Sequence, residues 1–267
     1  MKLTLMKIVP LLGCLIMLDG TTALAQDDNT EFTLSAGMDF TSGRYGGDVD
    51  IDDFYVPLTA TASRGRISYR LTVPYLSVRG PEGTLIYDPG AEPQPGSGDI
   101  VTESGLGDVI GSVTVYDVFG NPRLGLAIDL TGKIKFGTAD EEKGLGTGQN
   151  DYSVQADFYK FAEKLTVLGS VGYKFRGDPT DVELNDVVTA SLGGIYKFTP
   201  DVRGGLVFDY RESAISGNDA VQELTGFISR RINENWQLQF YALAGFSDSS
   251  PDMGVGFLMK RELRPQM

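Results

Sequence analysis

Hydrophobic and polar residues alternate with a period of two over long stretches of the chain, most clearly in RLGLAIDLTGKIKF (123–136). Leu126, Ile128 and Leu130 fall on one face of this stretch, whereas Asp129 and Lys133 fall on the other. Successive side chains of a β-strand point to opposite faces. The stretch therefore predicts a strand that is apolar on one side and charged on the other.

The same alternation predicts further strands along the chain. Together there are twelve, near residues 31–40, 51–62, 66–78, 106–118, 123–136, 151–161, 165–175, 187–198, 202–211, 221–232, 236–246 and 253–263. Most of them are close to the length of about 9 to 11 residues that a tilted strand needs to cross a bilayer.

Short and long connections between these strands follow one another in strict alternation. The short ones read SRG, GNP, AEK, TPD and NEN, and the long ones include 79–105 and 137–150. Membrane barrels have short periplasmic turns at one rim and longer extracellular loops at the other. We therefore expect an all-β fold, a transmembrane antiparallel β-barrel of about 12 strands with both chain ends in the periplasm.

Aromatic residues gather near the ends of the apolar faces, where interfacial girdles of membrane barrels lie. The set comprises Phe32, Phe40, Tyr75, Phe136, Tyr152, Phe158, Phe175, Tyr196, Phe198, Tyr210, Trp236 and Phe246. Aromatic residues also favour strands in general, so this pattern supports the barrel without deciding it.

The first residues have the layout of a secretory signal peptide. Lys2 and Lys7 precede the apolar run 8–18, which is shorter than the roughly 20 residues of a spanning helix, and Ala23-Leu24-Ala25 follows. We expect residues 1–25 to be cleaved after Ala25, and residues 26–267 to form a single outer-membrane β-barrel domain. A lipoprotein site at Cys14 is less favoured because the apolar run continues beyond it.

Composition removes several classes of function. The chain has no histidine, and its one cysteine lies in the predicted signal peptide. A Ser-His hydrolase, a Cys-His nucleophile and an ordinary zinc site therefore lose their central residue. A carboxylate pair remains possible by composition, but no motif brings two carboxylates into a cleft, so we expect no enzyme and no cofactor. The formal net charge of -13 argues against nucleic acid as a partner.

Two acidic stretches resemble ion or phosphate sites without completing them. Asp48, Asp50 and Asp52 match the first ligands of a calcium loop, but the turn glycine and the final glutamate are missing, so no metal is expected. The glycines of KFGTADEEKGLGTGQND (135–151) precede a strand rather than the helix of a phosphate-binding loop. This loop either stands clear of the barrel or folds over Lys133 and Lys135 as a gate.

If the apolar faces meet lipid, the opposite faces line the lumen. The candidate lumenal binding residues are Arg70, Asp129, Thr131, Lys133, Lys135, Gln155, Asp157 and Gln239. Charges of both signs inside a narrow barrel either form a plug or create a polar constriction that sorts solutes.

Two glycine-rich stretches carry a family resemblance. GLGDV begins at Gly105 and GLGTGQNDYSV begins at Gly144; together they resemble the outer-membrane barrel family labelled as phenol meta-pathway (MetA-type) proteins or "transporters". The resemblance implies passage of small, often aromatic or hydrophobic, compounds across the outer membrane. The chain departs from the family at Phe136-Gly137-Thr138, where a proline is usual, and it ends in KRELRPQM without a terminal aromatic residue.

Three functions follow from this reading. The first is an outer-membrane channel or facilitated-diffusion transporter for a small solute. The second is a closed structural or surface-interaction barrel without transport activity, and the third is a soluble periplasmic β-protein. The expected partners of a barrel are outer-membrane lipid and lipopolysaccharide, the outer-membrane insertion machinery and a small-molecule solute.

Overall fold

The structure is a computed structural model that describes residues 7–9, 17–19, 30–88, 91–179 and 183–263. The predicted signal peptide and its cleavage after Ala25 lie mostly outside these residues. Within it, only β1 (Lys7–Val9) and β2 (Met17–Asp19) are described, and they pair as a two-stranded ladder. Among the described residues, no helix has the length and apolar character to cross a membrane.

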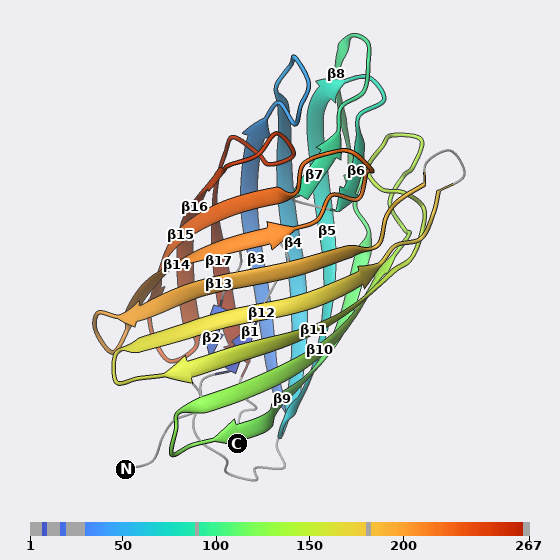
Figure 1. The fold of residues 1–267 in the computed structure, drawn as a ribbon. Helices are drawn as coiled ribbons and strands as arrows, with labels where there is room; N and C mark the ends of the chain where they lie inside the picture. Colours follow the sequence, from blue (N-terminus) through green and yellow to red (C-terminus); the bar gives the residue numbers. More distant parts are fainter. Residues whose placement is uncertain (1–6, 10–16, 20–29, 89–90, 180–182, 264–267) are drawn as a thin grey trace.

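Twelve antiparallel strands form a closed barrel (Figure 1). The ring closes where β3 (Glu31–Gly43) pairs with β17 (Met253–Leu263). The other strands of the ring are β4 (Ile51–Arg64), β5 (Ile67–Pro81), β9 (Val109–Asn121), β10 (Leu126–Phe136), β11 (Asp151–Phe161), β12 (Leu165–Phe175), β13 (Val187–Lys197), β14 (Val202–Arg211), β15 (Val221–Arg231) and β16 (Trp236–Gly245). The predicted fold, an antiparallel barrel of about 12 strands, is confirmed.

The predicted strand at 106–118 and the predicted loop at 79–105 are wrong in detail. The wall here consists of β8 (Ile100–Leu106) and β9, which both pair with β5 and are separated by Gly107 and Asp108. The loop also contains the hairpin of β6 (Leu85–Asp88) and β7 (Ala91–Gln94). Prolines and glycines break the alternation of this segment, so its short strands leave no signal of period two.

The outer surface of the barrel is apolar. Of the twelve aromatic residues predicted to face outward, all except Trp236 are between 36% and 60% exposed. Trp236 is half-buried, and the guanidinium of Arg261 lies 5.2 Å from its ring centre. An exterior of exposed rings and aliphatic side chains suits lipid rather than water.

Candidate functional site

The eight candidate lumenal residues all occupy inward-facing positions of their strands. Asp129, Thr131, Lys135, Asp157 and Gln239 are buried, and Arg70, Lys133 and Gln155 are half-buried. The register places several of them side by side, with Thr131 opposite Gln155 and Asp129 opposite Asp157. Gln239 lies on β16, on another part of the ring, so the set is spread over the lumen rather than gathered at one point.

Hydrogen bonds connect the polar wall of β9, β10 and β11. The hydroxyls of Thr114 and Thr131 are 2.9 Å apart, and the amide of Gln155 donates to Oδ1 of Asp157 at 2.7 Å. Oδ1 of Asp129 accepts the backbone N–H of Asp117 at 2.7 Å, beside a bulge in the β9–β10 register. These bonds fix the side chains in place and give this part of the lumen a defined polar surface.

An apolar belt, one side chain wide, crosses eight strands of the lumen, and reasoning from the sequence missed it. Each of the eight consecutive strands β10 to β17 contributes one buried, inward-facing residue: Ala127, Tyr159, Leu168, Ile195, Val207, Phe227, Tyr241 and Leu258. These residues were overlooked because the inward face was interpreted from its charged members. The sequence did contain a signal for them, because these aromatic and aliphatic residues occupy the strand positions that alternate with the lipid-facing residues.

Tyr241 on β16 connects the apolar belt to a carboxylate on β3, across the β3–β17 pairing that closes the ring. Its hydroxyl donates to Oδ2 of Asp39, which is buried. Gly256 lies between them in the register, and a Cβ at this glycine would be 2.4 Å from the Tyr241 ring. The missing side chain of Gly256 therefore lets the ring cross the neighbouring strand and reach Asp39.

A cap covers the extracellular mouth; it consists of the β6–β7 hairpin and the β10–β11 loop (137–150). Ile86 and Leu145 from the cap pack with Tyr55 and Leu76, which face inward from β4 and β5. The two parts of the cap are joined because the N–H of Ile86 donates to the carbonyl of Gly144 at 2.8 Å. The loop therefore folds inward instead of standing clear of the barrel.

The hairpin reaches the far side of the mouth. Tyr87 from β6 packs with Leu184 in the loop before β13, with Val187 at the start of β13 and with Ala214 in the loop between β14 and β15. In the ring, β5 and β13 are separated by β9, β10, β11 and β12. The chain thus crosses from one wall to another at the loop end of the barrel, where Figure 1 shows β6 and β7.

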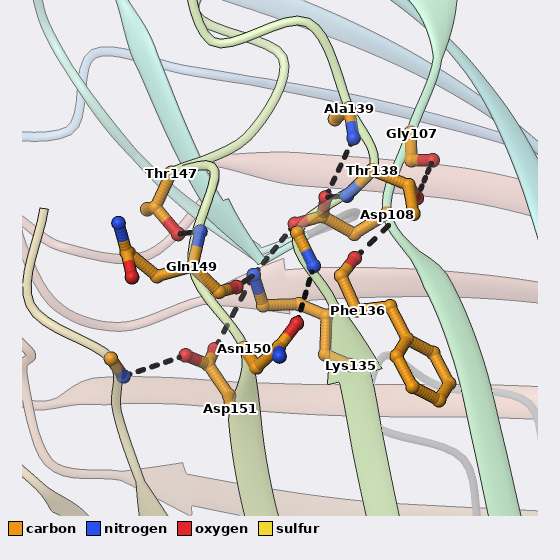
Figure 2. A network of polar contacts seen from close by, with 12 residues as sticks. Gly107, Asp108, Lys135, Phe136, Thr138, Ala139, Thr147, Gln149, Asn150 and Asp151 are labelled. Carbon is orange, nitrogen blue, oxygen red and sulfur yellow. Dashed lines mark hydrogen bonds and ion pairs between the residues drawn. The ribbon is translucent and has the colours of Figure 1, made fainter.

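Lys135, near the end of β10, anchors the β10–β11 loop of the cap (Figure 2). Its Nζ donates to Oδ2 of Asp108 at 2.6 Å and to the carbonyl of Gln149 at 3.2 Å, and lies 3.6 Å from Oδ2 of Asp151. The side chains of Lys135, Asp108 and Asp151 are at most 5% exposed. Removing one partner of a buried ion pair leaves an uncompensated charge and is strongly destabilising. The contacts of Lys135 therefore hold the β10–β11 loop in place.

Asp108 holds the other end of the loop. Its Oδ1 accepts the backbone N–H groups of Thr138 and Ala139, each at 2.9 Å. Asp108 belongs to the GLGDV stretch, whereas Leu145 belongs to the GLGTGQNDYSV stretch. A Cβ at Gly105 would lie 3.0 Å from Cδ1 of Leu145, so the two glycine-rich stretches meet at the cap.

Tyr45, from the loop between β3 and β4, completes the apolar packing below the cap. It is 9% exposed and packs in the cluster that contains Ile86 and Leu145. Burial raises the pKa of its phenol well above the usual range, and the nearby carboxylate of Asp53 raises it further. Tyr45 is therefore neutral at physiological pH and contributes packing rather than charge.

The glycine-rich stretches and the barrel wall fall within one family match. The model of the family described as "Putative MetA-pathway of phenol degradation" matches residues 19–259. The chain belongs to this family. The family resemblance inferred from the sequence is thereby confirmed. No curated protein matches the chain in a sequence search.

Solved structures share the fold of this family member at low sequence identity. An outer membrane channel from Pseudomonas putida F1 has a TM-score of 0.70 and 13% identity, over 88% of this chain and 95% of that one. The NanC porin has a TM-score of 0.56 and 7% identity, over 86% and 100%. The KdgM porin has a TM-score of 0.53 and 10% identity, over 87% and 99%. The fold is thus that of outer-membrane channels.

Proposed function

We propose that the protein is an outer-membrane channel that carries a small apolar or aromatic solute. The apolar belt is the observation that carries this proposal. The interior of a water-filled barrel is normally polar, whereas here eight consecutive strands turn apolar side chains inward. Such a wall offers little to a hydrated ion and a favourable surface to an apolar molecule. The names of the similar solved structures, a channel and two porins, support the same class of function.

The solute pathway begins at the cap and ends at the short turns. Below the cap, the solute meets inward-facing polar side chains, and we propose binding roles for Arg70, Asp129, Thr131, Lys133, Lys135, Gln155, Asp157 and Gln239. It also contacts the rings of Tyr159, Phe227 and Tyr241 in the apolar belt. Polar groups beside an apolar surface orient a molecule that has one polar group and one apolar body.

The same proposal covers the cellular setting. Residues 1–25 form a signal peptide that is cleaved, and residues 26–267 form one barrel in the outer membrane with both ends in the periplasm. The insertion machinery places it there, the exposed rings contact lipid, and the acidic loops approach lipopolysaccharide. The proposal includes no catalytic activity and no cofactor.

Flux through reconstituted protein tests the proposal. Liposomes with the protein should release phenyl β-glucoside, an aromatic solute whose sugar keeps it from crossing the bilayer unaided, faster than protein-free liposomes do. Phe227→Ser should lower this flux relative to potassium flux because it removes a ring of the apolar belt. Phe240→Ser is the matched control, since Phe240 is a lipid-facing ring that is 53% exposed. Liposomes that are as tight with the protein as without it would refute a transport function.

The buried cap favours a second candidate, a closed structural or surface-interaction barrel. Tyr87 and Ile86 are each 1% exposed, so the cap is well packed over the mouth. Replacement of residues 80–104 by a short glycine-serine linker separates the two functions. A channel would conduct more after this change, whereas a surface-interaction barrel would lose its partner and keep the same low conductance.

A further inference from the structure

Two neighbouring strands place carboxylates directly opposite each other inside the barrel. Asp209 on β14 pairs with Glu223 on β15, and both side chains face inward. Like charges directly opposite each other on a sheet are destabilising. Asp39 lies close enough to act electrostatically on Glu223, which makes a group of three carboxylates. These three are called the acidic subsite below.

One positive charge faces the acidic subsite and does not neutralise it. Arg211 acts electrostatically on both Asp209 and Glu223. One guanidinium cannot pair with all three carboxyl groups. The Nε and Nη2 atoms of Arg211 have no hydrogen-bond partner among the described residues, so it is not locked into a pair with either acid.

An uncharged polar group without a partner lies next to the acidic subsite. Thr225 is the next inward-facing residue after Glu223 on β15, whereas Gln239 is opposite Ser229, beyond Phe227 and Tyr241 of the apolar belt. Thr225 is 1% exposed, and its hydroxyl has no partner among the described residues. A buried polar atom without a partner costs about 1 to 3 kcal/mol. A ligand that binds there would remove this cost.

The surroundings indicate an organic rather than an inorganic cation. Among the described residues no three potential ligand side chains could hold one metal ion, so the three carboxyl groups of the acidic subsite do not converge as metal ligands do. The inward-facing residues that follow on β14, β15 and β16 are Val207, Phe227 and Tyr241, all members of the apolar belt. Aromatic rings attract ammonium groups through their faces and bind the attached hydrocarbon.

The extracellular loops add a field of the same sign. Asp140, Glu141 and Glu142 stand in the β10–β11 loop against a single lysine, and the β16–β17 loop has Asp248 and Asp252 with no basic residue. Negative charge at the mouth of a low-dielectric channel raises the local concentration of cations.

We propose that Asp39, Asp209 and Glu223 form a binding subsite for the ammonium group of a small organic amine, whose apolar body lies on the apolar belt. This inference rests on the proposed channel function and narrows its solute from any apolar molecule to an amphipathic cation. Asp39 offers Oδ1, which has no partner, while Tyr241 occupies Oδ2.

Calorimetric titration of the full-length protein in detergent tests the subsite directly. The probes are 2-phenylethylammonium, 2-phenylethanol and phenylacetate, which share the ring and differ in charge. The ammonium probe should bind about tenfold more tightly than phenylacetate, because it alone makes charge-assisted hydrogen bonds to carboxylates. Two variants are compared, Glu223→Gln and the double variant that also carries Asp209→Asn. The double variant should lose this preference and should bind 2-phenylethanol as the parent protein does.

Asp201→Asn is the matched control because Asp201 is an exposed carboxylate in the turn between β13 and β14. Heat-modifiable migration on gels verifies that each variant is folded. Equal affinity for the ammonium and carboxylate probes, or an ammonium preference that persists in the double variant, overturns the subsite. If liposomes with the protein release solute no faster than protein-free liposomes, but calorimetry still shows the ammonium preference, the channel is refuted and the subsite stands. Failure of the channel and failure of the subsite are therefore distinguishable.

Discussion

Lys135 is the residue whose removal should loosen the cap most directly. Lys135→Met leaves the buried carboxylate of Asp108 without its cation, which should cost about 3 kcal/mol of unfolding free energy in urea titrations. Proteolysis of the β10–β11 loop should become faster, because the carbonyl of Gln149 also loses its donor. Lys143→Met is the control, since Lys143 is an exposed lysine of the same loop. Equal stability of the two variants would contradict the anchoring role of Lys135.

Gly256 gives a second prediction at the scale of a residue. Gly256→Ala places a methyl group where the Tyr241 ring lies and should break its hydrogen bond to Asp39. We expect a loss of about 1 to 3 kcal/mol in unfolding free energy, the usual cost of overpacking. Gly132→Ala is the control, because nothing lies within 4 Å of a Cβ built there. If both variants unfold at the same urea concentration, the close approach is absent.

The β10–β11 loop is the element on which the closed mouth depends. Leu145→Asp puts a charge into the apolar cluster with Tyr55 and Leu76, and burial of an unpaired charge is costly enough to force the loop out. Single-channel conductance should rise, and the barrel should still migrate as a heat-modifiable band. Lys143→Asp introduces the same side chain at an exposed position of that loop and should conduct like the parent protein.

Elements differed in how far the sequence could predict them. A strand such as β11 (Asp151–Phe161) was predicted to the residue, because lipid on one side and protein on the other impose strict alternation. The β6–β7 hairpin left no such pattern, because prolines and glycines interrupt it and its packing partners Leu184 and Ala214 are far away in sequence. The eight polar lumenal residues were placed on the inward face for the same reason of parity. Parity also places the apolar belt there, but the inward face was interpreted from its charged members.

Embedding in lipid is a property of the whole molecule, and the single tryptophan of the chain reports on it. Trp236 begins β16 at the rim of the short turns, and the strand register turns it outward. In bilayers, its fluorescence should be quenched more strongly by lipids brominated near the headgroup than by lipids brominated near the chain end. Fluorescence that bromolipids do not change would place the barrel outside the membrane.

The pairing of β3 with β17 has a consequence for how the molecule comes into being. These two strands are neighbours in space although the whole of the barrel sequence lies between them. The edge of β3 must therefore remain unpaired until β17 has been made, and an unpaired edge can capture other chains. The pairing of β3 with β17 is an ordinary antiparallel ladder. A circularly permuted chain, in which a short turn links β17 to β3 and the new ends lie at another turn, should therefore form the same barrel with a different order of assembly.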